Sequence, residues 1–189
     1  MRVISGTAKR VELRVPSELA RPTTDKVRSA IFSRLVHVIP EAKVLDLFAG
    51  SGSLGIEALS RGATHATFVE QDRKAVQCIK KNLGLTKLET SATLVANSIE
   101  PGLKQLVARR QKFNLIFADP PYFKAATDIN WSHYLLEHDL LVKLIEPNSY
   151  FILEEQNNTP QLAKLKYWKL IRTDTYGLSS VHIYQRLKV

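Results

Sequence analysis

The chain has 189 residues, of which 44% are hydrophobic and 24% are charged, so it is long enough for one well-packed domain with a small appendage. Its 27 lysine and arginine residues exceed its 18 acidic residues, and the formal net charge of +9 favours a polyanionic partner. A lone cysteine excludes an internal disulfide, and no apolar run is long enough for a signal peptide or membrane helix, so we expect a soluble cytoplasmic protein.

The first 40 residues form a basic segment. Residues 2–6 and 11–15 alternate around a glycine-containing turn, which predicts a short β-hairpin. Residues 21–39 carry apolar side chains at helical spacing, with Thr23 or Thr24 as the cap and Asp25 in the first turn. We predict that residues 1–40 are an appendage to a domain over residues 41–189. If the protein binds nucleic acid, the phosphate contacts expected there are Arg2, Lys9, Arg10, Arg14, Arg21 and Arg28.

From residue 43 onward, strands and helices alternate, which is typical of a mainly parallel sheet covered on both faces. The strands expected span residues 43–49, 66–70, 92–96, 113–118, 150–155, 169–176 and 180–187. The helices expected between them span residues 54–62, 73–85, 102–110 and 131–145. This pattern predicts an α/β fold of the class I S-adenosylmethionine-dependent methyltransferases. Such a fold is Rossmann-like, with a seven-stranded, mainly parallel sheet and an antiparallel last strand.

A glycine loop follows the first of these strands. Gly50, Gly52 and Gly55 have the spacing Gly-x-Gly-x-x-Gly between a strand and a helix, and Glu70 closes the next strand twenty residues on. Glycines let a backbone approach a ligand closely, and a terminal carboxylate can accept hydrogen bonds from both hydroxyls of a ribose. The order of these features predicts a site for a nucleoside-containing cofactor, to which Phe48 and Ser51 of the same loop also contribute.

Asp46 distinguishes between two cofactors that share this outline. It lies inside the strand, where a dinucleotide-binding protein usually has only apolar residues, and it could hold the ammonium group of S-adenosyl-L-methionine. Alternatively, its carboxylate caps the loop itself, because an aspartate in a buried strand is otherwise unfavourable. Gln71, Asn97 and Ser98 follow the second and third strands, and they could read the adenine edge or simply lie in surface loops.

The fourth strand ends in the tetrapeptide Asp119, Pro120, Pro121 and Tyr122. Strands of open α/β sheets deliver ligand-binding residues to their carboxyl ends, so these residues should meet the glycine loop. A carboxylate and a proline carbonyl are two acceptors that match the two N–H donors of an exocyclic amine, and a tyrosine ring offers a stacking face. The tetrapeptide therefore predicts the catalytic site of an amino-group methyltransferase, although it could also be only a turn.

Several stretches together resemble the RsmD family of bacterial methyltransferases, which methylate the exocyclic N2 of a guanine in small-subunit (16S) ribosomal RNA. They cover nearly the whole chain and read RVISG, ARPTTDKVRSAIFSRL, VLDLFAGSGSLGIEALSRGA, TFVEQDR, FADPPY and IYQR. The resemblance implies that the glycine loop binds S-adenosyl-L-methionine, that Glu70 holds its ribose, and that the tetrapeptide binds the amine. It also implies that the basic segment meets ribosomal RNA, free or within an assembled or assembling subunit.

Other functions stay open at this stage. An adenine-N6 nucleic-acid methyltransferase or a protein glutamine methyltransferase needs the same two acceptors. The glycine loop and Glu70 alone would also permit a nicotinamide-dependent oxidoreductase, and a non-catalytic RNA-binding protein could retain such a pocket. The five histidines lack the spacing of a metal site, so we expect no metal, and we expect a monomer.

Overall fold

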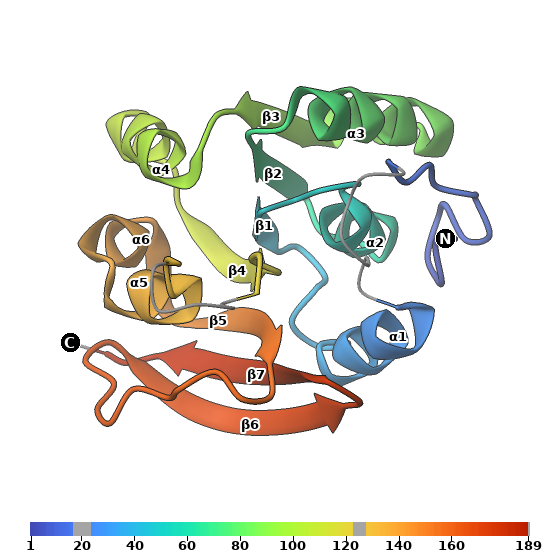
Figure 1. Cartoon of the computed structure of the whole chain (residues 1–189). Coiled ribbons are helices and arrows are strands. Elements are labelled where there is room, and N and C mark those ends of the chain that lie inside the picture. The colour runs from blue at the N-terminus through green and yellow to red at the C-terminus, as the bar shows by residue number, and fades with distance from the viewer. Residues whose placement is uncertain (17–23, 123–127, 189) are drawn as a thin grey trace.

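The computed structural model describes residues 1–16, 24–122 and 128–188, which form one sheet with helices on both faces (Figure 1). The strands are β1 (Lys43–Leu47), β2 (His65–Glu70), β3 (Ala92–Ala96), β4 (Phe113–Ala118), β5 (Ile145–Gln156), β6 (Trp168–Tyr176) and β7 (Ser179–Arg186). The helices are α1 (Asp25–Arg34), α2 (Ser53–Ser60), α3 (Arg73–Thr86), α4 (Ile99–Ala108), α5 (Trp131–Glu137) and α6 (Asp139–Lys143), with a 3-10 turn at Glu89–Ser91. No helix within these ranges is long and apolar enough to span a bilayer.

The sheet has seven strands in the order β3-β2-β1-β4-β5-β7-β6. Strands β1 to β5 pair in parallel, whereas β7 lies antiparallel between β5 and β6. The predicted class I methyltransferase fold is therefore confirmed. Because parallel strands share their direction, the carboxyl ends of β1, β2, β4 and β5 lie along one edge of the sheet.

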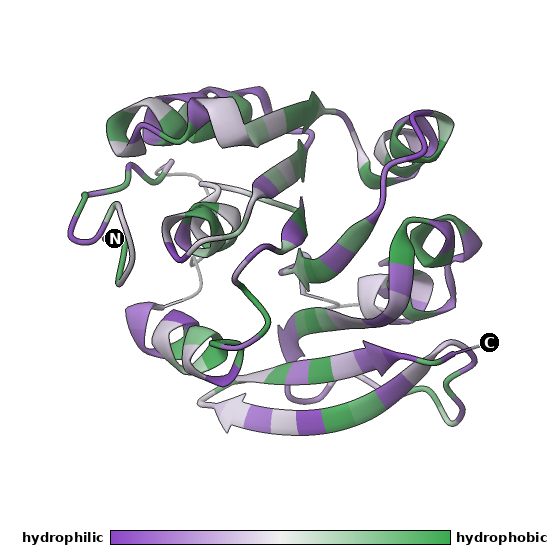
Figure 2. Ribbon diagram, turned by 180° about the vertical axis from the view of Figure 1, so that it is seen from behind, coloured by the Kyte–Doolittle hydropathy of each residue, from purple (hydrophilic) through white to green (hydrophobic). Residues whose placement is uncertain are grey.

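The strands bury both of their faces, which divides the core into two clusters. On β4, Leu115 and Phe117 belong to the cluster beneath α1, α2 and α3, while Ile116 and Ala118 belong to the cluster beneath α4, α5 and α6. Figure 2 shows apolar colour along the central strands and on parts of the helices that lie on both sides of them. Successive residues of a strand thus reach opposite faces, and this alternation decides which face each polar residue near a strand end reaches.

The N-terminal segment packs on the α2 side of the sheet rather than standing apart. Val3, Ala8 and Leu13 are buried in the same cluster as α1 and α2. The expected hairpin is reduced to one antiparallel bridge between Arg2 and Glu12, around a wide turn.

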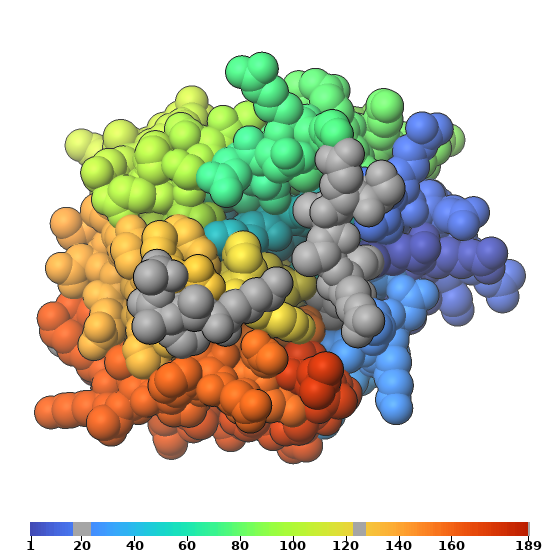
Figure 3. Space-filling view, in the orientation of Figure 1, coloured from blue at the N-terminus to red at the C-terminus, as the bar shows by residue number. Residues whose placement is uncertain are grey.

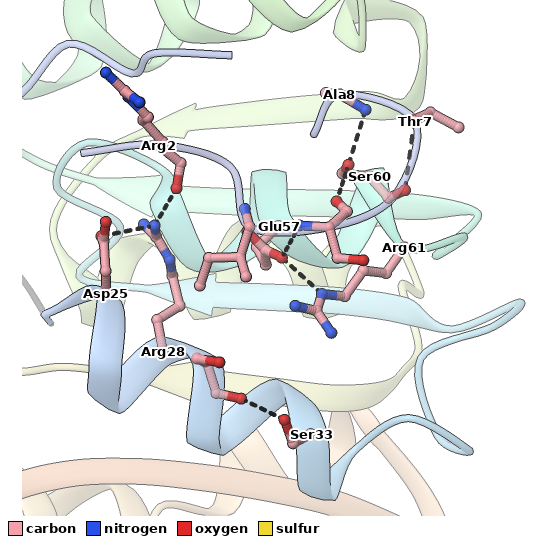
Figure 4. Close-up of polar contacts among 12 residues, drawn as sticks. Arg2, Thr7, Ala8, Asp25, Arg28, Ser33, Glu57, Ser60 and Arg61 are labelled. Atoms are coloured by element: carbon pink, nitrogen blue, oxygen red, sulfur yellow. Dashed lines mark hydrogen bonds and ion pairs between the residues drawn. The ribbon is translucent and has the colours of Figure 1, made fainter. Parts of the chain in front are cut away.

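Two residues of α2 hold this turn in place (Figure 4). The buried carboxylate of Glu57 accepts hydrogen bonds from the N–H groups of Ile4 (2.7 Å) and Ser5 (3.1 Å). The carbonyl of Ser60 accepts one from the N–H of Thr7 (2.7 Å). The start of the chain is therefore fixed to the helix that follows the glycine loop.

Helix boundaries agree with the expected caps in most places. Thr24 caps α1 by accepting a hydrogen bond from the N–H of Val27 (3.3 Å), and Gly62 follows α2 with a positive φ of 102°. The helix expected over residues 131–145 is wrong in its extent, because the chain breaks at His138 and its ring accepts a hydrogen bond from the N–H of Leu140. Residue 145 already belongs to β5.

Candidate active site

The glycine loop and the tetrapeptide meet because β1 and β4 are neighbours. Asp46 pairs with Phe117 and Leu47 with Ala118, so both strands end at the same level. The loop after β1 and residues 119–122 after β4 consequently share one edge of the sheet. In Figure 3 the yellow atoms around residue 120 lie beside the cyan atoms of the β1 region on one face of the molecule.

Asp46 is almost completely buried, at 2% exposure, on the α2 side of the sheet. Its Oδ2 accepts a hydrogen bond from the N–H of Gly55 (2.9 Å), so the carboxylate caps the first turn of α2. Burial is the main reason why the pKa of Asp46 rises to about 8, and the nearby carboxylates of Asp119 and Glu70 add to the increase. A cationic group placed beside Asp46 would reverse this shift, which makes the position suited to an ammonium ion.

Glu70 is folded back onto the glycine loop. Its Oε2 accepts a hydrogen bond from the N–H of Gly50 (2.8 Å), and its Oε1 accepts one from the N–H of Asp72 (2.8 Å). Asp72 in turn caps α3 by accepting from the N–H of Ala75 (2.8 Å). The carboxylate of Glu70 therefore lies beside the loop, while Gln71 is exposed next to it.

The start of α2 fits the carboxylate end of S-adenosylmethionine. Gly52 is the N-cap in a left-handed conformation with φ of 77° and makes no side-chain cap, so a ligand can approach the N–H groups of α2 that precede that of Gly55. A Cβ at Gly55 would lie 2.3 Å from the ring of Phe68 and 3.1 Å from Asp46, so the helix can approach the sheet this closely only with glycine there. Loop, helix start and flanking acids thus fit a small zwitterionic group joined to a ribose.

Phe48 connects the glycine loop to α5. Its φ of 56° is unusual for a bulky residue, and such strain is common at functional sites. Its ring meets that of Trp131 edge to face at 5.0 Å between centroids, and Trp131 meets Tyr134 at 5.3 Å. This row of rings links the glycine loop to α5, the helix that borders the tetrapeptide.

The residues of the tetrapeptide differ in their exposure to solvent. Asp119 is partly buried and Pro120 is buried, whereas Pro121 and Tyr122 are exposed, with 39% of the tyrosine accessible. This places the acceptor side chain at the edge of the protein interior and the flat ring toward solvent. A nucleobase entering from solvent could stack on Tyr122 while its amine reaches Asp119.

The two candidates after β3 serve local structure. The side chain of Asn97 accepts a hydrogen bond from the N–H of Ser98 (3.0 Å), and Ser98 is the N-cap of α4 without a side-chain cap.

The basic segment exposes four of its six predicted RNA contacts: Arg2, Lys9, Arg10 and Arg14. Arg21 lies outside the described residues. Arg28 is a correction, because its side chain is fully buried at 0% exposure. Its guanidinium donates to the carbonyl of Arg2 and forms an ion pair with Asp25 (3.0 Å). Arg28 thus holds the N-terminal segment to α1 and is not a surface contact.

Asn82 is a residue that sequence reasoning missed. It is fully buried on α3, and its side chain forms hydrogen bonds with the backbone of Arg14 and with the carbonyl of Ser51. An asparagine on an otherwise apolar helical face is the only signal that could have drawn attention to it.

No group of three or more histidine, cysteine, aspartate or glutamate side chains suited to a metal ion occurs within residues 1–16, 24–122 and 128–188.

Comparisons with known proteins identify the family. The model of the family described as "Conserved hypothetical protein 95" matches residues 1–185. A protein of Escherichia coli (strain K12) named Ribosomal RNA small subunit methyltransferase D is 35% identical over 98% of this chain and 90% of its own. The chain belongs to the RsmD family. The predicted resemblance is thereby confirmed.

Two further RsmD relatives support the match over the full length. The Bacillus subtilis (strain 168) protein YlbH is 39% identical over 98% of this chain and 99% of its own. The solved structure of Escherichia coli yhhF is 34% identical, with a TM-score of 0.81 over 99% of this chain and 98% of that one. Both matches therefore extend over the N-terminal segment as well as over the sheet and its helices.

Proposed function

We propose that this RsmD protein transfers a methyl group from S-adenosyl-L-methionine to the exocyclic N2 amine of a guanine in small-subunit (16S) ribosomal RNA. The observation that carries the proposal is that the Asp-Pro-Pro-Tyr tetrapeptide follows β4 while the glycine loop follows the neighbouring β1, so that both lie at the same edge of the sheet. Two hydrogen-bond acceptors for an amine thus lie next to the glycine loop, where the cofactor is proposed to bind. The RNA substrate follows from the family, whose member in Escherichia coli is named for small-subunit ribosomal RNA.

S-Adenosyl-L-methionine supplies an electrophilic methyl group when it is bound. The amine of guanine is a poor nucleophile, because its lone pair is drawn into the ring. Asp119 and the carbonyl of Pro120 can accept its two hydrogens, which favours a pyramidal nitrogen whose lone pair faces the methyl group. Asp119 can then take the proton that the methylated nitrogen releases, and Pro121 stiffens the turn that holds both acceptors.

The cofactor is assigned to the glycine loop by residue chemistry. Asp46 would hold the ammonium group, the start of α2 would face the carboxylate, and Glu70 would turn from the loop to the ribose hydroxyls. We assign the adenine to the loops after β2 and β3, where Gln71, Asn97 and Ser98 lie.

The RNA backbone is assigned to residues 1–40 and to the neighbouring surface of α3. Arg14 lines a shallow groove together with Lys74 and Lys81, and all three side chains are exposed. Exposed lysine and arginine side chains around one groove suit the phosphates of an RNA strand. We propose that residues 1–40 position the RNA while residues 41–189 carry out methyl transfer.

The protein is proposed to act as a monomer in the cytoplasm on ribosomal RNA, either free or in an assembled or assembling subunit. Size-exclusion chromatography with light scattering tests the first point. Comparing naked small-subunit RNA with isolated subunits as methyl acceptors tests the second.

The decisive experiment maps N2-methylguanine in small-subunit RNA from cells with and without this protein. We expect one guanine to lose its methyl group in the deletion strain and to regain it when the purified protein and S-adenosyl-L-methionine are added. Identical maps from the two strains would refute the proposed function.

A further inference from the structure

A small pocket lies beside the amine site, between the ends of β4 and β5 and the start of α5. Its lining includes Pro120, Pro121, Tyr122, Trp131, Ser132 and Glu155. One wall is therefore the tetrapeptide itself, and another is a carboxylate from the next strand. A base that places its amine at Asp119 and stacks on Tyr122 would extend its remaining edge toward this pocket.

The sheet register brings Glu155 next to the tetrapeptide. Ala118, the last residue of β4, pairs with Leu153, and two residues further along the two chains Pro120 and Glu155 line the same pocket. The side chain of Glu155 points to the α5 face, like that of Leu153, because strand residues two apart share a face.

One oxygen of Glu155 is firmly held. Its Oε1 contacts Nε2 of His182 (3.0 Å) and accepts a hydrogen bond from the side-chain amide of Gln161. His182 is itself fixed, because its Nδ1 forms a hydrogen bond with the hydroxyl of Thr173 (2.8 Å). Two neighbouring strands and the segment after β5 thus orient this carboxylate.

The other oxygen of Glu155 meets no donor at hydrogen-bond geometry among residues 1–16, 24–122 and 128–188, although the residue is only 3% exposed and the hydroxyl of Ser132 lies close to the carboxylate. Burial alone would raise the pKa of Glu155, but the neighbouring His182, Ser132 and Gln161 together hold it below its usual value. The group is therefore a carboxylate at neutral pH. Buried, oriented carboxylate oxygens without a donor are uncommon, and one that borders a pocket indicates a donor on the ligand.

We infer that Oε2 of Glu155 accepts a hydrogen bond from N1–H of the target guanine, while the N2 amine of the same base lies between Asp119 and Pro120. The inference rests on the proposed function and adds a residue that selects the base. In guanine, N1–H and the N2 amine are neighbouring donors on the same edge, so acceptors on adjacent strands can meet both.

This contact explains how the same tetrapeptide chemistry could be restricted to guanine. In adenine, N1 carries a lone pair instead of a hydrogen. Its N1 would therefore face the carboxylate of Glu155 as a second hydrogen-bond acceptor, with no proton between the two. A site built to receive an N–H rejects an analogue that lacks it, because its buried acceptor is then left without a partner. The amine acceptors alone would not make this distinction.

The test uses 2-aminopurine, which keeps the exocyclic amine of guanine but lacks N1–H. Small-subunit RNA is prepared by ligation with either guanine or 2-aminopurine at the methylated position, and kcat/KM is measured for both. The proteins compared are the wild type, Glu155→Gln and the control Glu146→Gln. Glu146 is an exposed glutamate at the opposite end of β5, so its replacement makes the same chemical change away from the pocket.

We expect the wild type and the Glu146→Gln variant to prefer guanine over 2-aminopurine by at least about 50-fold. The Glu155→Gln variant should lose efficiency on guanine and reduce the preference to within about fivefold, because an amide can donate to the bare N1 of 2-aminopurine. A Glu155→Gln variant that keeps the full preference would overturn the inference. So would a wild type that uses both bases equally, a result that decides the matter even if Glu155→Gln fails to fold.

Failure of the proposed function would look different. In that case the wild type would transfer no methyl group to guanine-containing RNA, and both the function and this inference would be refuted. If guanine is methylated but Glu155 has no influence on base choice, only the inference fails, and Glu155 is then a structural partner of His182.

Discussion

The side chain of Asn82 holds the backbone of Arg14 at two points. Its Oδ1 accepts a hydrogen bond from the N–H of Arg14 (2.8 Å), and its Nδ2 donates one to the carbonyl of Arg14 (2.9 Å). The same Nδ2 donates to the carbonyl of Ser51 (2.9 Å) in the glycine loop. One buried amide on α3 therefore joins the basic N-terminal segment to the proposed cofactor cradle.

Replacing Asn82 with Ala should weaken both ends of this connection. Three backbone groups, of which the carbonyl of Ser51 is buried, would each lose a hydrogen bond, which should lower the free energy of unfolding by about 2 kcal/mol. We also expect the dissociation constant for S-adenosyl-L-methionine to rise several-fold, as measured by calorimetry. The exposed Lys80 on the same helix provides the control, and an effect of Lys80→Ala equal to that of Asn82→Ala would contradict this role.

Replacing Asp46 with Asn should make stability less dependent on pH. Because burial raises the pKa of Asp46 to about 8, the folded protein keeps this carboxyl protonated while the unfolded chain ionises it near 3.8. Its stabilising contribution is complete below the lower value and is lost as pH rises through the upper one. As pH rises between these limits, the free energy of unfolding of the variant should therefore increase relative to that of the wild type by up to about 1.4 kcal/mol per pH unit. Denaturant unfolding at several pH values measures the difference in free energy of unfolding between the two proteins. A difference that does not change with pH would contradict the raised pKa of Asp46.

Replacing Asp119 with Ala should abolish methyl transfer but spare cofactor binding. The substitution removes an acceptor for the amine, so kcat should fall by about 100-fold or more. The dissociation constant for S-adenosyl-L-methionine should stay within a few-fold of the wild type. Asp139→Asn, at an exposed acid on α6, is the control, and loss of cofactor binding in Asp119→Ala would mean that this residue belongs to the cofactor site.

Neutralising the basic groove should flatten the salt dependence of RNA binding. A variant with Lys74 and Lys81 changed to Ala, and one with Arg10 and Arg14 changed to Ala, should each reduce the slope of log K against log salt by about 1–2. Lys143→Ala on α6 should leave the slope unchanged. Equal slopes for all four proteins would exclude these side chains as phosphate contacts.

Replacing Gly55 with Ala should disturb the packing of α2 beside the glycine loop. The added Cβ would lie 2.3 Å from the ring of Phe68, so α2 must shift from the sheet, at a cost of about 1–3 kcal/mol. Gly84 on α3 is the matched control, because a Cβ there would meet only Glu89 at an ordinary 3.5 Å. We expect Gly84→Ala to preserve or raise the melting temperature, while Gly55→Ala lowers both the melting temperature and cofactor affinity. A Gly55→Ala variant with unchanged affinity would show that the close packing of α2 is not needed for the ligand.

The sequence by itself determined the order of elements and the residues at the strand ends. Alternating periods of two and of 3.6 residues, with glycine and proline at the breaks, predict the seven strands because these signals are local. For the same reason the sequence predicts Asp46 as an acid within a strand and Glu70 and Asp119 as acids at strand ends. It also carries the family motifs, which lie in continuous stretches.

Only the tertiary structure decided which of these residues face one another. Arg28 appears as one more basic residue in the sequence, and its burial depends on how α1 packs against the N-terminal segment. Glu155 reads as the end of a strand, and its place beside Pro120 follows from the register of β4 and β5. Asn82 joins segments 31 and 68 residues away. Such contacts arise from packing between distant segments, and no local pattern records which partner a buried polar side chain will find.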